Sequence, residues 1–128
     1  MKKIMIALTL FLTSNAYANE SHCLARILYQ ESRGESVEGV ATLGQTAVQL
    51  ATNMKITLCK LERSGQVQSK EIPAPLLPAF TALANIAMTQ PRLLSKGSDH
   101  WETGKKPHMP GKIKRVVGAH VFYQLSSN

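Results

Sequence analysis

Three glutamates, Glu31, Glu35 and Glu38, lie close together in the stretch CLARILYQESRGESVEG, which covers residues 23–39. The chain has only 8 acidic residues in all. Like charges this close together repel one another, so their concentration indicates a use other than folding. A carboxyl that holds a proton can give it to the leaving oxygen of a glycosidic bond. The stretch therefore contains a candidate acid for the cleavage of glycosides.

Glu31 is the candidate for that role because it continues an apolar helical stripe. It follows Leu24, Ile27 and Leu28 at intervals of seven, four and three residues, which share one face of a helix. It also falls in the last turn, near the negative end of the helix dipole. Desolvation and the dipole both disfavour the charged carboxylate. The alternative is a helix-end glutamate that is hydrogen-bonded to a neighbouring turn.

The residues around Glu31 have less definite expected roles. Glu35 either hydrogen-bonds the loop that shapes a cleft or is solvated. Glu38 is predicted to be an acid in the first turn of the next helix, where the dipole favours it. Arg33 could pair with either of these acids or hold a loop carbonyl, and Tyr29 is expected to pack beside Glu31.

His100 and Trp101 lie in a second stretch that could bind a sugar. Residues 95–112, SKGSDHWETGKKPHMPGK, are rich in glycine and proline and are predicted to form a long loop. An aromatic face packs well on a pyranose ring, although a single buried tryptophan can also serve only to anchor a loop. His120, in a mainly apolar segment, is predicted to be a core histidine.

The elements that must position these residues are mostly helices. Helical periodicity predicts one from a Ser21 N-cap to Ser32 or Arg33, with Gly34 as its stop, and another from a Ser36 N-cap to Asn53 or Lys55. A further helix is predicted over residues 76–88. Residues 55–75 are predicted to be irregular. The terminal RVVGAHVFYQL, residues 115–125, alternates like a strand but also fits a helix.

The first 18 residues have the pattern of a secretory signal peptide. Two lysines are followed by an apolar run, residues 4–12, and by Ala16-Tyr17-Ala18, which is a small-x-small cleavage site. The run is too short for a bilayer, which needs about 20 residues, although a permanent N-terminal anchor is the alternative. We therefore expect an exported single domain, residues 19–128, in the periplasm or secreted, without stable membrane insertion.

The two cysteines, Cys23 and Cys59, are both in this domain. In an oxidising compartment two lone cysteines most simply pair with each other, so a Cys23–Cys59 disulfide is predicted. A metal site is not expected, because the chain has neither C-x-x-C nor H-E-x-x-H and its histidines are not at ligand spacing. No cofactor is expected either.

The chain is basic, with a formal net charge of +7. Residues 104–115 hold five lysines and arginines and no acid. Such a segment attracts polyanions, and for an exported protein the nearest one is the cell wall, with its stem-peptide carboxylates. A solvated loop face is the alternative. Binding of nucleic acid would depend on charge alone and is not expected.

Residues 23–39 resemble the signature of the bacterial cell-wall hydrolase family that includes spore-cortex-lytic enzymes. Members carry patterns close to C-L-A-x-x-x-Y-x-E-A-R-G-E-x-x-E-G. The chain matches at Cys23, Leu24, Ala25, Tyr29, Glu31, Arg33, Gly34, Glu35, Glu38 and Gly39. Ser32 stands where the family usually has alanine, and a Glu-Ser pair is what the broader lysozyme-like lytic transglycosylases carry at their catalytic position.

Weaker similarities continue downstream. TLCKLERSGQVQS resembles the family's second-cysteine segment, with Gln66 kept and Val67 in place of an aromatic residue. GSDHWE is similar to a Gly-x-x-His-aromatic stretch that places His100 and Trp101 in the cleft. VVGAHVFYQL is similar to the closing Ile-Gly-x-His-x-Phe-Tyr. The segment of residues 55–92 is short and divergent.

The resemblance implies a fold, an activity and a set of site residues. The expected fold is α+β and predominantly helical: a lysozyme-like single domain with a small β element near the C-terminus and one disulfide. The expected activity is cleavage of peptidoglycan between N-acetylmuramic acid and N-acetylglucosamine, with Glu31 as the catalytic acid. The expected substrate-binding or supporting residues are Tyr29, Arg33, Glu35, Gln66, His100 and Trp101.

Two alternatives stay open beside this reading. Many family members are lytic transglycosylases, in which one glutamate acts first as acid and then as base. A muramidase would need a second carboxylate, for which Asp99 and Glu102 are the candidates. A non-catalytic peptidoglycan-binding or assembly protein on a degenerate hydrolase scaffold is the alternative of a different class.

Overall fold

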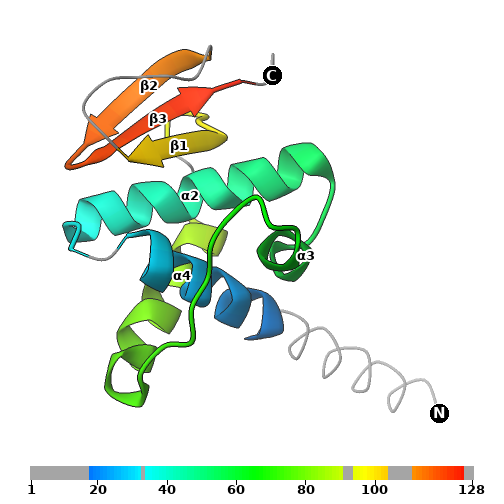
Figure 1. Ribbon diagram of the computed structural model, residues 1–128, viewed down its shortest axis with the longest axis vertical. Coiled ribbons are helices and arrows are strands. Elements are labelled where there is room, and N and C mark those ends of the chain that lie inside the picture. Colours follow the sequence, from blue (N-terminus) through cyan, green and yellow to red (C-terminus); the bar gives the residue numbers. More distant parts are fainter. Residues whose placement is uncertain (1–17, 33, 91–93, 104–110, 126–128) are drawn as a thin grey trace.

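The computed structural model describes residues 18–32, 34–90, 94–103 and 111–125. Nearly all of the expected signal peptide, Arg33 and most of the basic segment of residues 104–115 lie outside these ranges. Along the described part of the chain, helices come first and a small sheet comes last (Figure 1). The expectation of an α+β fold with a β element near the C-terminus is confirmed.

The helical part consists of one long central helix and shorter helices around it. A helix over residues 18–31 is followed by α2 (Val37–Met54), α3 (Leu58–Arg63), the short 3₁₀ helix η1 (Ala74–Leu76) and α4 (Leu77–Thr89). The three strands are β1 (His100–Thr103), β2 (Lys112–Val117) and β3 (His120–Gln124). All pairings are antiparallel and β3 lies in the middle, in the order β1-β3-β2.

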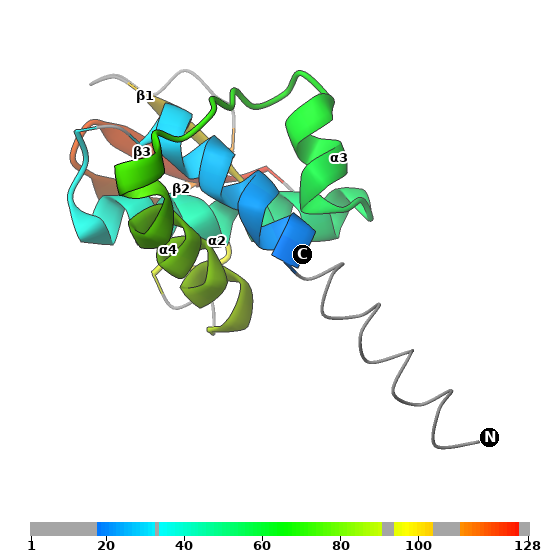
Figure 2. The ribbon, with the colours of Figure 1, turned by 90° about the horizontal axis from the view of Figure 1, so that it is seen from below.

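Helix α2 is the middle layer of the molecule. The sheet packs on one side of it, and α4 and the helix of residues 18–31 lie on the other side (Figures 1 and 2). Ser36 caps its first turn by accepting a hydrogen bond from Gly39 N at 3.1 Å, as its sequence predicts. Burial on two sides explains why polar Thr42, Gln45 and Thr46 are buried together with the apolar residues of this helix.

The structure corrects four of the expected elements. Ser21 is not an N-cap, because the helix already includes residue 18 and the Ser21 hydroxyl donates to the Ala18 carbonyl. Residues 55–75 are not irregular throughout, since Thr57 caps α3 by accepting from Lys60 N at 3.0 Å. The predicted long loop contains β1. The terminal segment is β-structure, but its first part belongs to β2 and the whole forms a hairpin turning at residues 118–119.

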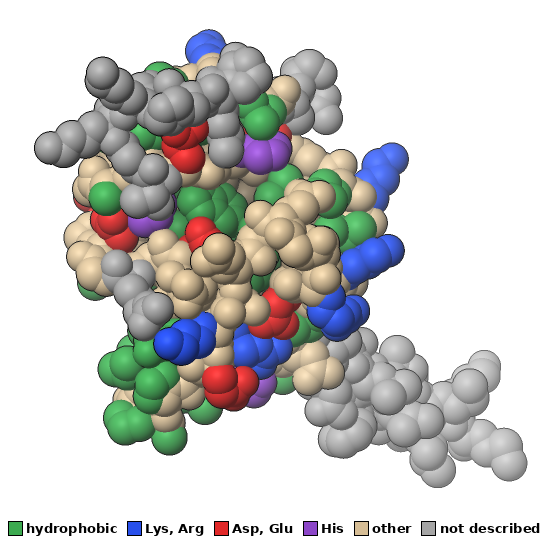
Figure 3. Space-filling model, viewed as in Figure 1, with side chains coloured by type: hydrophobic (Ala, Val, Ile, Leu, Met, Phe, Trp, Pro, Cys, Tyr) green, Lys and Arg blue, Asp and Glu red, His purple; other side chains and the backbone are tan. Residues whose placement is uncertain are grey.

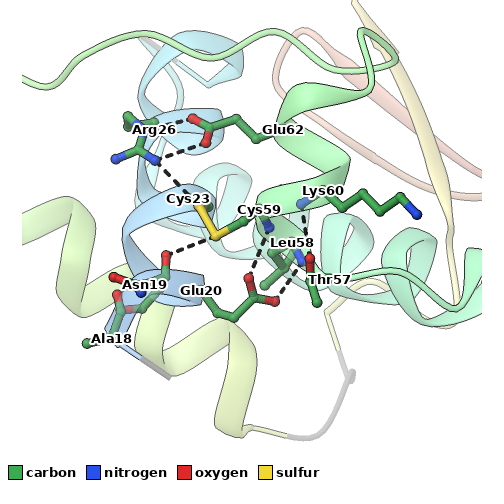
Figure 4. Close-up of a disulfide and its surroundings, with 11 residues drawn as sticks. Ala18, Asn19, Glu20, Cys23, Arg26, Thr57, Leu58, Cys59, Lys60 and Glu62 are labelled. Carbon is green, nitrogen blue, oxygen red and sulfur yellow. Dashed lines mark hydrogen bonds and ion pairs between the residues drawn. A yellow bond between two sulfur atoms is a disulfide. The ribbon is translucent and has the colours of Figure 1, made fainter. Parts of the chain in front are cut away.

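The predicted disulfide between Cys23 and Cys59 is confirmed (Figure 4). It joins the helix of residues 18–31 to α3. Glu20 strengthens the junction, because its two carboxylate oxygens accept hydrogen bonds from Leu58 N at 2.7 Å and Cys59 N at 3.0 Å. These are two backbone N–H groups at the start of α3 that have no partner within the helix.

An ion pair between Arg26 and Glu62 closes the same junction. The Arg26 guanidinium donates to both Glu62 oxygens, at 2.7 and 2.9 Å, and the Glu62 side chain is only 12% exposed. Burial acts to raise the pKa of Glu62, but the hydrogen bonds and charge of Arg26 outweigh it. The pKa of Glu62 therefore lies below its ordinary value of 4.5.

The lowered pKa of Glu62 predicts an acid-sensitive contribution to stability. A carboxyl whose pKa is lowered by folding stabilises the protein above the unfolded pKa, and this contribution is lost as the pH falls through the folded value. Glu62→Gln should lower the free energy of unfolding by about 1–2 kcal/mol at neutral pH. In urea titrations across the pH range the difference from wild type should shrink below pH 4.5. An equal difference at acidic and neutral pH would contradict the assignment.

Among the described residues, no helix combines the length and the apolar character needed to cross a membrane.

Candidate functional site

An open cavity of about 140 Å³ lies between the helical layers and the sheet. Its walls come from the helix of residues 18–31, from α2, from β1 and from the extended segment of residues 66–72, here called the strap. The face of the molecule in Figure 3 has a recess that exposes hydrophobic side chains and has acidic and histidine side chains around it. The cavity is lined by Glu31, Leu50, Gln66, Val67, His100 and Trp101. Four of the residues singled out from the sequence thus share one cavity.

Glu31 is the last helical residue before Ser32, and its side chain is half-buried at the cavity wall. Each of its carboxylate oxygens accepts one hydrogen bond from an N–H group. Gln68 N donates to Oε1 at 2.9 Å, and the Trp101 indole Nε1 donates to Oε2 at 2.9 Å. The two donors belong to different segments, the strap and β1, and together they orient the carboxylate.

The strap supplies the backbone donor to Glu31 that sequence reasoning missed. It is the green segment that runs from α3 toward η1 in Figure 1. Val67 and Ile72 anchor it in the core, and Lys70 N donates to the Arg26 carbonyl at 3.3 Å. Gln68 acts through its main-chain N–H, which every residue except proline has, so no side-chain signal in the sequence could have identified it.

Trp101 lies on β1, opposite Phe122 of β3, and not in a loop as expected. Its indole is half-buried against the core and also lines the cavity. It therefore anchors the strand and presents a surface to the cavity at the same time. The two functions that the sequence left as alternatives are compatible in this structure.

His100, the neighbour of Trp101, is held by a buried acid. Asp99 is 1% exposed, and its Oδ1 contacts the His100 Nδ1 at 2.9 Å. The same carboxylate accepts from Leu125 N at 2.8 Å and from the Asn53 amide at 3.0 Å. Asp99 is thus occupied with tying α2 to the sheet and orienting His100.

The two candidate second carboxylates do not face the cavity. Neither Asp99 nor Glu102 is among the described residues that line it. Glu102 follows Trp101 on β1 and, unlike Trp101 and His100, is not one of the lining residues. Glu31 is therefore the one carboxylate that the described structure places on the cavity wall.

Glu35 is bound to the turn between β2 and β3. Its Oε1 accepts from Ala119 N at 3.2 Å and contacts the His120 Nδ1 at 3.0 Å. The side chains of Glu35 and His120 are 10% and 4% exposed. Glu35 is therefore hydrogen-bonded and not solvated, but the turn that it binds is not among the described residues that line the cavity. His120 is buried, as expected, and both its ring nitrogens have partners.

Tyr29 and Glu38 lie away from the cavity. Tyr29 is buried against α4, with its ring edge-on to Phe80 at a centroid distance of 5.4 Å. It shares the helix with Glu31 but is not one of the lining residues, so its contribution is to the packing of that helix. Glu38 lies in the first turn of α2, as predicted, and pairs with Arg115 of β2.

Within the described part of the chain, Glu20, Cys23 and Cys59 form the one group of acidic, histidine or cysteine side chains close enough together to hold a metal ion. Both cysteines are in the disulfide, and a metal requires free thiolates. This group does not form a metal site in the oxidised protein.

No family model, no curated protein and no solved structure matches the chain.

Proposed function

We propose that the chain is an exported, lysozyme-like peptidoglycan-cleaving enzyme. Its activity is that of a lytic transglycosylase on the bond between N-acetylmuramic acid and N-acetylglucosamine. The observation that carries the proposal is the setting of Glu31: a carboxyl on the wall of an open cavity, oriented by two N–H donors and adjacent to an indole. The resemblance of residues 23–39 to cell-wall hydrolases supplies the substrate class.

The proposed reaction uses Glu31 twice. The protonated carboxyl first gives its proton to the oxygen that leaves from the anomeric carbon, and the glycosidic bond breaks. The resulting carboxylate then accepts the proton of the muramic acid 6-hydroxyl as that oxygen bonds to the same carbon. The product is a 1,6-anhydro sugar, Glu31 is protonated again, and no water is consumed.

The two donors to Glu31 have a specific part in this cycle. Between the two proton transfers Glu31 carries a negative charge inside a partly closed cavity. The Gln68 and Trp101 N–H groups already point at its oxygens and stabilise that charge without reorganisation. They also keep the carboxyl directed at one position in the cavity, as proton transfer requires.

The remaining cavity residues suit a sugar. Trp101 offers an aromatic surface, and Gln66 and His100 offer polar groups that can bind hydroxyl or acetamido groups. Outside the cavity, Lys112 and Lys114 of β2 belong to the basic segment of residues 104–115, which would attract the anionic wall. Nucleic acid need not be invoked as a partner.

A muramidase is less well supported than a transglycosylase. It would need a second carboxylate across the sugar from Glu31. Asp99 is buried in structural hydrogen bonds, and Glu102 is not among the described residues that line the cavity. Neither of the two candidates named from the sequence is placed for that role.

The signal pattern of residues 1–18 and the disulfide are both consistent with an exported enzyme, whose substrate lies outside the cytoplasm. The alternative of a different class is a wall-binding or assembly protein on a degenerate hydrolase scaffold, which the short segment of residues 55–92 favours. Incubation of the chain from Asn19 onward with purified murein sacculi separates the two. The enzyme releases soluble muropeptides, whereas a binding protein pellets with intact sacculi and releases none.

A further inference from the structure

His120 joins the sheet to Glu31 and Glu35, which lie 89 and 85 positions before it in the sequence. It begins β3 at the end of the hairpin turn. Its Nε2 lies 3.0 Å from the backbone carbonyl oxygen of Glu31, and its Nδ1 lies 3.0 Å from Glu35 Oε1. The ring is buried between the end of the helix that carries Glu31 and the segment that precedes α2.

The partners of His120 determine where its hydrogens are. A backbone carbonyl can only accept, so Nε2 must donate to Glu31. On the other side, a carboxyl oxygen and a ring nitrogen 3.0 Å apart need a hydrogen between them. The contact with Glu35 is therefore a hydrogen bond whose hydrogen belongs either to the ring or to the carboxyl.

Two glycines leave the space for Glu35. A Cβ built at Gly118, where φ is +55°, would lie 2.1 Å from Glu35 Oε2. A Cβ at Gly39, on α2, would lie 3.2 Å from the same oxygen. Ala119 N then donates to the other oxygen, Oε1, at 3.2 Å. The hairpin turn and the first turn of α2 thus both accommodate the Glu35 carboxylate.

We infer that Glu35 and His120 are positioning residues for the reaction of Glu31, an inference that rests on the proposed function. The last carbonyls of a helix have no partner within the helix. His120 supplies that partner to Glu31 itself, the residue whose side chain must stay directed into the cavity. Glu35 holds the His120 ring in place and fixes which nitrogen faces the carbonyl. Without the pair, the last turn loses its fixed direction, and the Glu31 carboxylate loses its alignment with Gln68 N and the Trp101 indole.

The variant Glu35→Gln tests the pair with little change in shape. Oε1 of Glu35 accepts from Ala119 N and also shares a hydrogen with the His120 ring. An amide nitrogen at that position cannot accept from Ala119, and an amide oxygen there leaves any charge on the buried ring unbalanced. Glu38→Gln is the matched control, because Glu38 is three residues away, pairs with Arg115 and does not touch His120.

A spectroscopic measurement reads the effect at Glu31 directly. The chain has one tryptophan, so the Trp101 indole gives a single peak in a proton–nitrogen correlation spectrum, and this N–H donates to Glu31. We expect both Glu35→Gln and Glu31→Gln to move or broaden the indole peak, and Glu38→Gln to leave it in place. Gly118→Ala, which displaces Glu35 without removing a polar group, is a second variant with the same expected result.

The rate of cleavage of sacculi is the second readout of the positioning role. Glu35→Gln should lower kcat on sacculi by on the order of 10²-fold, because a misplacement of about 1 Å has an effect of that size, while sedimentation with sacculi is unchanged. If the indole peak and kcat stay at wild-type values in folded Glu35→Gln and Gly118→Ala, the positioning role is wrong. If Glu31→Gln is itself fully active, the proposed function fails instead, and the indole measurement still reports on the contact.

Discussion

Glu31→Gln is expected to lower the release of muropeptides from sacculi by roughly 10³-fold or more, while the variant still sediments with sacculi. Glutamine has nearly the same shape as glutamate but no proton that it can transfer to a leaving oxygen. The loss should be large because the proposed reaction uses this carboxyl in both steps. Binding should persist because Trp101, Gln66 and His100 still line the cavity.

The same substitution should have a small cost in stability. Both oxygens of Glu31 accept from N–H groups, and an amide can present only one oxygen. Its nitrogen must then face either the Gln68 N–H or the Trp101 indole, which places two donors against each other. Thermal unfolding of the variant should therefore show a loss of about 1 kcal/mol, without loss of the fold.

Glu71→Gln is the control for Glu31→Gln, because Glu71 is an exposed acid on the same strap. It removes one negative charge near the cavity and leaves both hydrogen bonds to Glu31 intact. Its activity should stay close to that of the wild type. Equal losses in the two variants would mean that overall charge, and not a transferable proton, controls activity.

Removal of the disulfide is expected to have the largest effect on stability. The bridge between Cys23 and Cys59 spans 36 positions, and closing a loop of that length restricts the unfolded chain. Replacing both cysteines by alanine should lower the free energy of unfolding by about 3–4 kcal/mol. Urea denaturation, with and without a reducing agent, measures the difference.

The loss of the disulfide should also affect the position of Glu31 at the cavity and therefore the activity. Helix α3 leads directly into the strap, whose Gln68 N–H holds Glu31. The Arg26–Glu62 pair and the cap by Glu20 still hold α3 in the variant, so activity should fall less than stability. A reducing agent should destabilise the wild type to the level of the double variant and leave the variant unchanged. Equal stability of the oxidised wild type and the variant would contradict this prediction, because it would show that the other contacts hold α3 equally well without the disulfide.

The sequence predicts those parts of the fold whose signal is local. Helix α2 has a capping serine followed by a long periodic stripe, and α4 has Pro78 in its first turn and ends shortly before Pro91. The disulfide follows from the presence of two cysteines in an expected oxidising compartment. The two helices depend on residues that are close in sequence. The disulfide has only one possible pairing because the chain has two cysteines.

Short elements and long-range contacts cannot be predicted from local sequence signals. Helix α3 has six residues, too few to show a helical period, and β1 has four in a stretch rich in glycine and proline. Their formation depends on tertiary partners: Glu20 and the disulfide for α3, and β3 for β1.

The residues around the cavity also divide into those that the sequence identifies and those that only the structure reveals. The residue types at Glu31, His100 and Trp101 identify them as candidates, and the structure brings all three to one cavity. The contact of Glu35 with His120 joins residues 85 positions apart, and spacing cannot reveal it. The Gln68 N–H has no sequence signal at all, because it belongs to the backbone.

The origin of the oxygen atoms in the product tests the central claim most directly. Sacculi are digested in water labelled with heavy oxygen, and the released muropeptides are weighed by mass spectrometry. If Glu31 alone serves as acid and then as base for the sugar's own hydroxyl, the new muramic ends are anhydro sugars and carry no label. Ends that have gained labelled oxygen would show that water attacks the sugar, and the account of a single carboxyl acting in both steps would then be wrong.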